Sequence, residues 1–520
     1  MNRRAFLRDL TATATLPWLA TGCVGGEADS VVATASGRVR GRVDAGIHAF
    51  RGVPYAAPPI GAHRYRPPRP VRAWSGVRDA IALGPTPPQP ATPPPLEFFA
   101  PPIPGADYLN LNIWTREPGS ARMPVVVWIF GGGFDTGSNG LYDGTAFARD
   151  GVVFVAMNYR LGAEGFLFLD DEVANVALLD QISALEWVRD NIAAFGGDPD
   201  NVTIAGQSAG AMAVGTLLTM PRASGLFRRA ILESGAGNLC YSAATAREIG
   251  QRLVTKLGVA ADRDAVATAG VERVLAAQTA VMGDLARQPD PQRWGGEPGC
   301  RVNMWRPTLD GSTLSAAPVD AVTAGAGADV DVLIGHNGAE GRLSLVPFRG
   351  LDSVTEAELA TAMHLYRLPV ERALTAYRAA YPGADPGALL AIVQGDWFYT
   401  VPGLRLADAH APAPASTYMY EFTWRSPQFD GQLGSCHFLE VPFAFDRLHD
   451  PRMRWLTGPN PPQQLADLVH GAWVQFATTG RVHWPPYEPL RRTTMRLDLE
   501  PTVIDDPCPV RTLWEGIALT

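Results

Sequence analysis

Residues 202–214 read VTIAGQSAGAMAV, a short apolar run followed by a serine that stands between two glycines. Gly206, Ser208 and Gly210 have the spacing G-x-S-x-G, and the small and apolar residues from Ala209 onward are typical of a helix. A strand, a sharp turn and a helix in this order would present the serine hydroxyl as a nucleophile. The alternative is an ordinary loop serine. Five residues do not decide between the two, so the rest of the chain has to supply a base, an acid and donors for an oxyanion.

The segments around this motif predict a mostly parallel sheet flanked by helices. PVVVWIF (124–130) and VVFVAMNY (152–159) are rich in β-branched residues and apolar throughout, as expected of strands buried on both faces of a sheet. Apolar residues recur at helical spacing over residues 175–195, and GGDP (196–199) is expected to end this helix and open a turn. Alternating strands and helices indicate an α/β domain.

Two longer stretches stand outside this alternation. GPTPPQPATPPPLEFFAPPIPG (84–105) is too rich in proline for a regular element, so we expect a stiff surface loop. Residues 353–412 look mainly helical, with AELATAMHLY (357–366) and VERALTAYRAAY (370–381) as amphipathic pieces. We expect them to form an insertion beside the sheet, which is a candidate lid. The chain contains no internal repeat and no clear linker, so residues 29–520 are expected to form one domain.

Composition and charge exclude several classes of protein. Of the 520 residues, 46 % are apolar and 18 % are charged, which allows a sizeable core and argues against global disorder. The formal net charge is −8, and no basic stripe is present, so nucleic acid is not an expected partner. No later run reaches the about 20 apolar residues that span a bilayer. The sequence does not predict an oligomeric state.

Residues 1–28 are predicted to be an export signal. NRRAFLRDLTATATLPWLATGC (2–23) has a pair of arginines, then a modestly apolar stretch that ends in small residues. It resembles a bacterial twin-arginine signal, which a receptor reads and which is not a membrane anchor. The end of this stretch also resembles a lipoprotein site with Cys23 as the acylated residue, although Ala20 stands where leucine is usual. We therefore expect export in a bacterium, to the periplasm, to the medium or to a lipid-anchored position at the cell envelope. A membrane contact is expected only through a lipid on Cys23.

The chain has five cysteines: Cys23, Cys240, Cys300, Cys436 and Cys508. The last four could form disulfides in an oxidising compartment. Their spacings fit neither a zinc site nor a dense disulfide framework. Cys240 with Cys300 is the candidate bridge.

A second glycine-rich segment lies upstream of the serine. WIFGGGF (128–134) follows a predicted strand and contains Gly131, Gly132 and Gly133. Glycines let backbone N–H groups approach a small anion without a Cβ in the way. A flexible turn is the alternative interpretation. The downstream G-x-S-x-G pattern favours an oxyanion-binding loop.

The base has to be one of nine histidines. The order nucleophile, acid, histidine is that of the α/β hydrolases. If the acid lies near residue 340, this order leaves four candidate bases, and the residues alone do not choose among them: His437, His449, His470 and His483.

Motifs along most of the chain resemble those of the type-B carboxylesterases, a family that includes bacterial para-nitrobenzyl esterases, animal carboxylesterases and cholinesterases. Each motif alone is weak, but together, in the family's order from about residue 30 to beyond residue 480, they are highly specific. The matching segments are FRGVPYAAPPIGAHRYRPP (50–68), DYLNLNIW (107–114), WIFGGGF (128–134), NYRLGAEGFL (158–167), LLDQISALEWVRDNIAAFGGDPDNVTIAGQSAGA (178–211), ILESGA (231–236), IGHNGAEG (334–341) and GSCHFLEVPFAF (434–445).

The resemblance implies an α/β-hydrolase fold and a serine esterase that cleaves small to medium carboxylic esters through an acyl-enzyme. It makes Ser208 the nucleophile, Glu340 the orienting acid and His437 the general base and acid. It assigns the oxyanion to three backbone N–H groups, those of Gly132, Gly133 and Ala209. The expected partner is a small-molecule ester, and neither a metal nor an organic cofactor is expected.

The chain departs from the family's pattern in three places. Phe130 stands where histidine or tyrosine is often found, and Gln207 replaces the usual glutamate before the nucleophile, which removes a charge beside the site. Pro87 and Tyr108 replace both cysteines of a disulfide found in many relatives, so that bridge is not expected.

Several other side chains leave two interpretations open. Cys436, His437 and Glu440 are close in sequence, but no second ligand cluster accompanies them, so we do not predict a metal site. Ser234 is expected to support the acid rather than to take part in the chemistry. Two aromatic residues are candidates for either the pocket or the core: Phe134 and Trp424.

Two other functions remain open at this point. A binding or adhesion protein on the same fold would have lost the nucleophile or the histidine, whereas this chain retains both. An enzyme with the same site could instead act on long-chain lipids, amides or a lactone, because the pocket and the lid decide the substrate.

Overall fold

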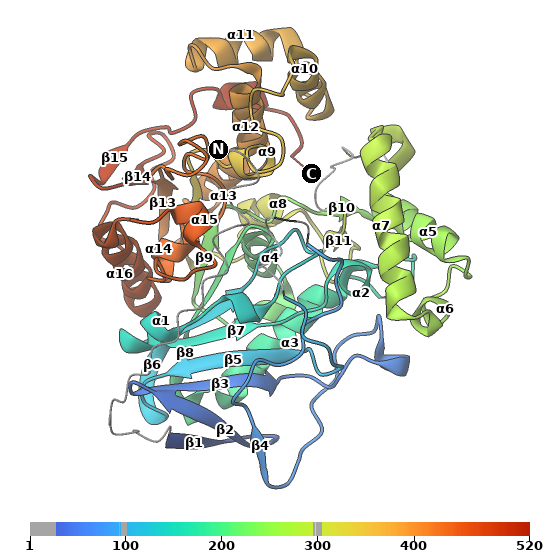
Figure 1. Ribbon diagram of the computed structural model, residues 1–520, viewed down its shortest axis with the longest axis vertical. Helices are drawn as coiled ribbons and strands as arrows, with labels where there is room; N and C mark the ends of the chain where they lie inside the picture. The colour runs from blue at the N-terminus through green and yellow to red at the C-terminus, as the bar shows by residue number, and fades with distance from the viewer. Residues whose placement is uncertain are drawn as a thin grey trace, which may run out of the picture.

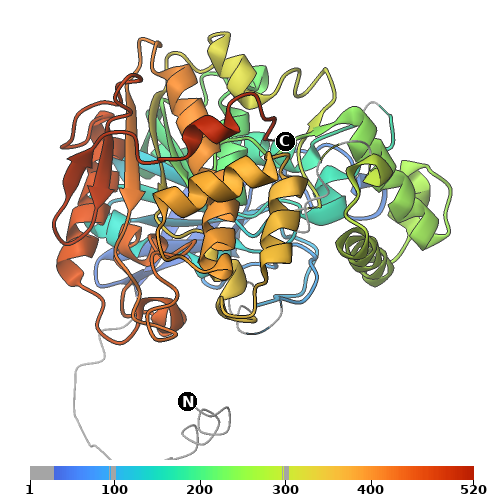
Figure 2. The same cartoon turned by 90° about the horizontal axis from the view of Figure 1, so that it is seen from above.

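One large sheet dominates the fold (Figures 1 and 2). The computed structural model describes residues 28–92, 94, 101–171, 173–294, 297 and 304–519. Thirteen strands of these residues form the sheet, in the order β1-β2-β3-β5-β7-β6-β8-β9-β12-β13-β14-β15, with β4 paired to β2. The expected export signal, with Cys23, lies outside the described residues, and so does Cys300. Export, acylation and a Cys240–Cys300 bridge therefore stay predictions.

The centre of the sheet is parallel, and its edges are antiparallel except where β4 pairs in parallel with β2. Seven consecutive strands run parallel: β7 (Val153–Met157), β6 (Gly119–Ile129), β8 (Phe195–Gln207), β9 (Arg229–Glu233), β12 (Asp331–Asn337), β13 (Thr417–Phe422) and β14 (Thr494–Leu497). The flanking strands are β1 (Ala28–Thr34), β2 (Gly37–Asp44), β3 (Ile47–Pro54), β4 (Val77–Asp79), β5 (Asn110–Thr115) and β15 (Thr502–Ile504). Carboxyl ends of parallel strands meet at one edge of a sheet, where a site is expected. The predicted fold class is confirmed.

The strands and the helix predicted around the serine are present. The runs at 124–130 and 152–159 form the buried part of β6 and all of β7. The helix expected over 175–195 is α3 (Val176–Asn191), followed by a short 3₁₀ turn, η4 (Ile192–Ala194). The helix expected after the serine is α4 (Ala209–Leu217), which packs on β8 and β9.

The turn expected at GGDP lies inside a strand. β8 begins at Phe195, and its pairing with β6 jumps from Met123–Gly197 to Val125–Val202. Between these two pairs, β6 advances by two residues and β8 advances by five. The additional residues of β8 have no partner in β6 and form a bulge. The bulge accommodates the residues that the sequence pattern indicated as a turn.

Residues 353–412 form the expected helices: α10 (Glu356–Leu365), α11 (Val370–Ala380), α12 (Pro386–Gly395), a π-helical turn η7 (Asp396–Thr400) and α13 (Val401–His410). Thr355 and Glu358 form a reciprocal capping box at the start of α10, and Asp385 caps α12. In Figure 1, α10 and α11 lie at the top of the molecule, at the far end from β1 and β2. Their role as a lid stays a prediction.

A second helical group, which the sequence analysis did not predict, lies at the right of Figure 1: α5 (Ala243–Leu257), α6 (Arg263–Thr268) and α7 (Val271–Arg287). The remaining helices are α1 (Thr145–Arg149), α2 (Gly162–Phe166), α8 (Pro318–Thr323), α9 (Arg342–Leu345), α14 (Val441–Ala444), α15 (Arg454–Thr457) and α16 (Gln463–Thr479). A small sheet pairs β10 (Tyr241–Ser242) with β11 (Thr308–Leu309). In the described part of the chain, no helix is both long and apolar enough to cross a membrane.

The described residues of the proline-rich segment form no regular element, as predicted. Thr86 pairs with Ile103 across the loop, with 3.0 Å between the Thr86 N and Ile103 O atoms. Gln89 connects the same loop to the residues just after the glycine-rich segment, because its Oε1 accepts a hydrogen bond from the N–H of Gly137 at 2.7 Å.

Candidate active site

Ser208 lies at the sharp turn between β8 and α4. Its φ of 58° and ψ of −127° are strained for a residue with a side chain. The Ser208 N–H donates to the carbonyl of Glu233 at 2.8 Å, and the Ser208 carbonyl accepts from the N–H of Met212 at 2.9 Å. These bonds fix the turn, which matches the strand–turn–helix geometry of a nucleophile elbow.

The two glycines of the motif have no room for a side chain. A Cβ on Gly210 would lie 2.0 Å from the Ile129 carbonyl oxygen, at the end of β6. A Cβ on Gly206 would lie 2.6 Å from the carbonyl carbon of Gly210. Close packing of the elbow on β6 therefore explains the spacing G-x-S-x-G.

Glu340 and His437 meet, although they are far apart in sequence. Glu340 follows β12, and its Oε2 accepts from Nδ1 of His437 at 2.6 Å. Its Oε1 accepts from the N–H of Asn337 at 2.7 Å and from the Ser234 hydroxyl at 2.6 Å. The Glu340 residue is 3 % exposed, so this carboxylate is buried with hydrogen bonds to both oxygens.

The other side of the imidazole contacts two residues that sequence reasoning did not place there. Nε2 of His437 lies 3.1 Å from Nε2 of Gln207, and the ring stacks on Tyr399 of η7, with 4.5 Å between ring centroids. Among the described residues, no hydrogen bond joins the Ser208 hydroxyl to His437. The two side chains line the same cavity.

This cavity has a volume of about 150 Å³. Ser208, Gln207 and His437 line it together with the glycine-rich loop, and Leu343 and Phe438 contribute apolar surface. A small apolar cavity with a few convergent polar groups is typical of a site for a small organic molecule.

The glycine-rich loop turns sharply beside Ser208. Gly132 has a φ of 110°, and a Cβ there would lie 2.1 Å from the Thr136 carbonyl oxygen. The Gly132 carbonyl accepts from the N–H groups of Asp135 and Thr136 at 3.1 and 3.0 Å. Within the described chain, the N–H groups of Gly132 and Gly133 have no hydrogen-bond acceptor, and the N–H of Ala209, at the start of α4, has none within its helix. These donors are available to an anion.

The carboxylesterase family model matches residues 28–509. The chain belongs to the carboxylesterase family. It is 35 % identical to the para-nitrobenzyl esterase of Bacillus subtilis (strain 168), over 92 % of this chain and 96 % of that one. It is 36 % identical to the phenmedipham hydrolase of Pseudarthrobacter oxydans, over 86 % and 89 % of the two chains. A solved carboxylesterase of Geobacillus stearothermophilus superposes with a TM-score of 0.81 at 36 % identity, covering 93 % of this chain and all of the other.

The protein is thus a type-B carboxylesterase, an enzyme that hydrolyses carboxylic esters, and its fold is that of its relatives. The family match confirms that the motifs from about residue 30 to beyond residue 480 are those of a type-B carboxylesterase.

A second buried carboxyl group lies beside the acid of this carboxylesterase. The Ser234 hydroxyl, which donates to Glu340, is also 3.4 Å from Oε1 of Glu440, and Asn337 donates to Oε2 of Glu440. Burial, reinforced by the charge of Glu340, raises the pKa of Glu440 to about 7. Ser234 therefore has a supporting position, as expected. The described residues contain no group of three or more His, Cys, Asp or Glu that could hold a metal ion, and the absence of a metal stays a prediction.

The cysteines and aromatic residues that were left open lie mainly in the core. Cys240, Cys436 and Cys508 are buried and not bridged to one another. Phe134 is fully buried and packs on Phe166, which favours the core interpretation. Trp424 packs on Phe443, with 5.1 Å between ring centroids.

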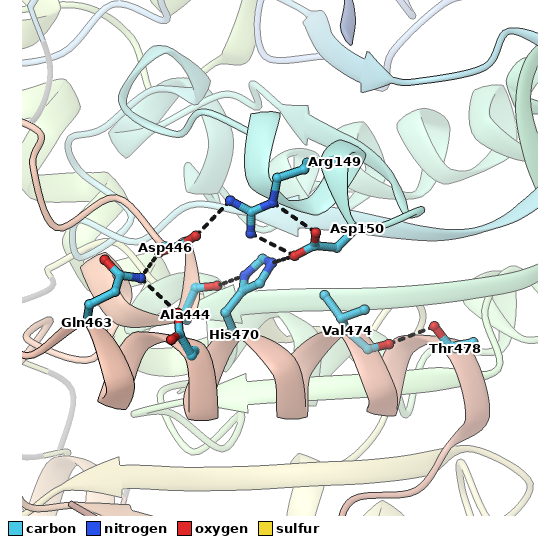
Figure 3. Close-up of polar contacts among 9 residues, drawn as sticks. Arg149, Asp150, Ala444, Asp446, Gln463, His470, Val474 and Thr478 are labelled. Atoms are coloured by element: carbon cyan, nitrogen blue, oxygen red, sulfur yellow. Dashed lines mark hydrogen bonds and ion pairs between the residues drawn. The ribbon is translucent and has the colours of Figure 1, made fainter. Parts of the chain in front are cut away.

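The other candidate bases of the carboxylesterase do not approach Ser208. His449 and His483 are exposed. His470, on α16, is buried, and Figure 3 shows both of its nitrogens engaged: Nδ1 lies 2.7 Å from the Ala444 carbonyl and Nε2 lies 3.1 Å from Oδ2 of Asp150. Arg149 links Asp150 to Asp446, so this network ties α16 to α1 and α14. His470 is a structural residue.

We predict that His470→Gln lowers the midpoint of thermal unfolding by about one to three degrees and leaves kcat close to the wild-type value. The side chain of glutamine cannot satisfy both acceptors, and an unsatisfied buried group costs about 1–3 kcal/mol. The check is differential scanning calorimetry with an ester assay on the same preparation. A loss of activity as large as that of a His437→Gln variant would contradict the structural role.

Proposed function

We propose that this carboxylesterase cleaves small to medium carboxylic esters through an acyl-enzyme on Ser208, with His437 as the base and Glu340 as the orienting acid. The observation that carries the proposal is the 2.6 Å contact between Glu340 and His437, in a cavity that Ser208 also lines. The carboxylate accepts a hydrogen bond from Nδ1–H, which stays on the ring, so the free lone pair of the neutral imidazole is on Nε2.

In the first half of the reaction, the Ser208 oxygen attacks the ester carbonyl while its proton moves to Nε2 of His437. The charge on the carbonyl oxygen is stabilised by the N–H groups of Gly132, Gly133 and Ala209. Collapse of the tetrahedral intermediate expels the alcohol, which takes the proton from His437, and leaves the acyl group on Ser208.

In the second half, His437 takes a proton from water, and the resulting hydroxide oxygen attacks the acyl carbon. The acid leaves, and the proton returns to Ser208. Every step uses side chains and amides of this chain, so the proposal needs no metal or cofactor. Export of the enzyme, through residues 1–28, is proposed from the sequence alone.

The substrate class is tested with para-nitrophenyl acetate, butyrate, octanoate and laurate, all assayed at the same pH. We expect kcat/KM to be highest for the shorter chains and to fall at laurate, because the described cavity has a volume of only about 150 Å³. A burst of nitrophenol equal to the enzyme concentration would support an acyl-enzyme. A maximum at laurate would contradict the substrate class, and binding without turnover would support an adhesion protein instead.

A further inference from the structure

The base of the proposed reaction is already bonded in the free enzyme. Nε2 of His437 lies 3.1 Å from Nε2 of Gln207, the residue directly before the nucleophile and the last of β8. Gln207 is 1 % exposed. An amide nitrogen has no lone pair to offer, so it must donate, and the imidazole nitrogen must accept.

This contact occupies the atom that catalysis needs. Because Nδ1–H of His437 donates to Glu340, the ring has only one lone pair in its plane, on Nε2. That lone pair cannot accept both the amide proton of Gln207 and the hydroxyl proton of Ser208 with good geometry. The missing Ser208–His437 hydrogen bond among the described residues is consistent with this competition.

Both partners of the contact are held firmly. The glycine-rich loop packs on Gln207: a Cβ on Gly131 would lie 2.6 Å from the Gln207 carbonyl oxygen and 3.2 Å from its Oε1. The imidazole is fixed at one edge by Glu340 and on one face by Tyr399. The amide of Gln207 and the hydroxyl of Ser208 therefore compete for Nε2 of His437 in the cavity that all three residues line.

We propose that Gln207 is a positioning residue which holds the resting imidazole of His437 through Nε2 and has to release this atom before Ser208 can be deprotonated. The inference rests on the proposed function, because it assumes that His437 is the base. The proposal also gives a physical effect to the presence of Gln207 where the family usually has glutamate. A carboxylate can only accept and would favour the protonated ring, whereas the amide donates to the neutral ring that can act as a base.

The first test is Gln207→Met, which keeps the length of the side chain and removes the amide. The readout is the second-order rate constant for the reaction of diisopropyl fluorophosphate with the free enzyme. We expect it to rise about two- to ten-fold, the factor that corresponds to one neutral hydrogen bond. Gln181→Met is the matched control, because Gln181 is a fully buried glutamine of α3 and should leave the rate constant unchanged. A rate constant that is unchanged or lower in Gln207→Met overturns the proposal.

The second test is the pH profile of kcat/KM in Gln207→Glu. The titratable groups around His437 are Glu340, Glu440, Cys436 and Tyr399, and all of them stay the same in this variant. The new carboxylate favours the imidazolium, which cannot accept a proton, so the acid limb is expected to move to higher pH by about one unit. Gln207→Met serves as the uncharged comparison. Superimposable profiles for the two variants would overturn the proposal.

These outcomes are separable from a failure of the proposed function. If Ser208→Ala still reacts with the fluorophosphate at the wild-type rate, the nucleophile is wrong and the Gln207 variants do not bear on the base. If Ser208→Ala is inert and the Gln207 variants behave like wild type, the triad assignment stands and the role of Gln207 is wrong.

Discussion

Ser208→Ala is expected to lower kcat by a factor on the order of 10⁶, by analogy with nucleophile deletions in other serine hydrolases. The reason is geometric as well as chemical. The strained φ of 58° holds the Ser208 side chain in the cavity that His437 also lines, and an alanine methyl group there cannot form an acyl-enzyme. The measurement is kcat for para-nitrophenyl butyrate with protein purified to exclude wild-type carry-over.

Ser183→Ala is the matched control, since Ser183 lies on α3 and is not among the residues lining the cavity. Its kcat should match that of the wild type, and both variants should unfold at similar temperatures. Substantial turnover in folded Ser208→Ala protein would remove Ser208 from the mechanism.

Glu340→Gln is expected to cost about four orders of magnitude in kcat, the effect of the corresponding change in a serine protease triad. Oε1 of Glu340 receives two donors, the N–H of Asn337 and the hydroxyl of Ser234. The amide oxygen of glutamine will therefore take that position, and its NH₂ group will face Nδ1 of His437. Nδ1 of His437 must then accept a hydrogen bond from this NH₂ group, so the imidazole proton moves to Nε2. Nε2 then has no lone pair with which to take the proton of Ser208.

Glu440→Gln separates this effect from a general loss of buried charge. Glu440 shares the contacts to Ser234 and Asn337 but has no hydrogen bond to His437. We expect a much smaller loss of kcat than for Glu340→Gln, with both proteins folded by circular dichroism. Equal losses in the two variants would show that the Glu340–His437 contact has no special role.

The features that the sequence predicts correctly are those that depend on residue patterns within a short segment of the chain. The second half of β6 and all of β7 are buried and read as apolar runs. Gly206 and Gly210 are required by the close packing of the elbow on β6, so the G-x-S-x-G spacing, together with the apolar run before it and the helical residues after it, indicates the turn at Ser208. The sequence predicts a turn where β8 bulges, because glycine, aspartate and proline are the residues that dominate turns.

The features that were missed depend on contacts between distant segments. The order nucleophile, acid, histidine allows four histidines as the base, and only the resemblance to the family selects His437 among them. The stacking of Tyr399 on His437 requires the π-helical turn of the insertion to reach the site, and no pattern in the residues around 399 indicates it. Gln207 was recognised as a departure from the family, but its bond to His437 depends on how two loops meet.

The most direct test of the account is to label the pure enzyme with diisopropyl fluorophosphate and to locate the adduct by peptide mass spectrometry. The serine oxygen displaces fluoride from phosphorus, so the product reports which hydroxyl the base activates. We expect one adduct per chain, on the peptide that contains Ser208, formed in step with the loss of esterase activity. An adduct on another residue, or full activity after complete labelling of Ser208, would contradict the assignment of the nucleophile.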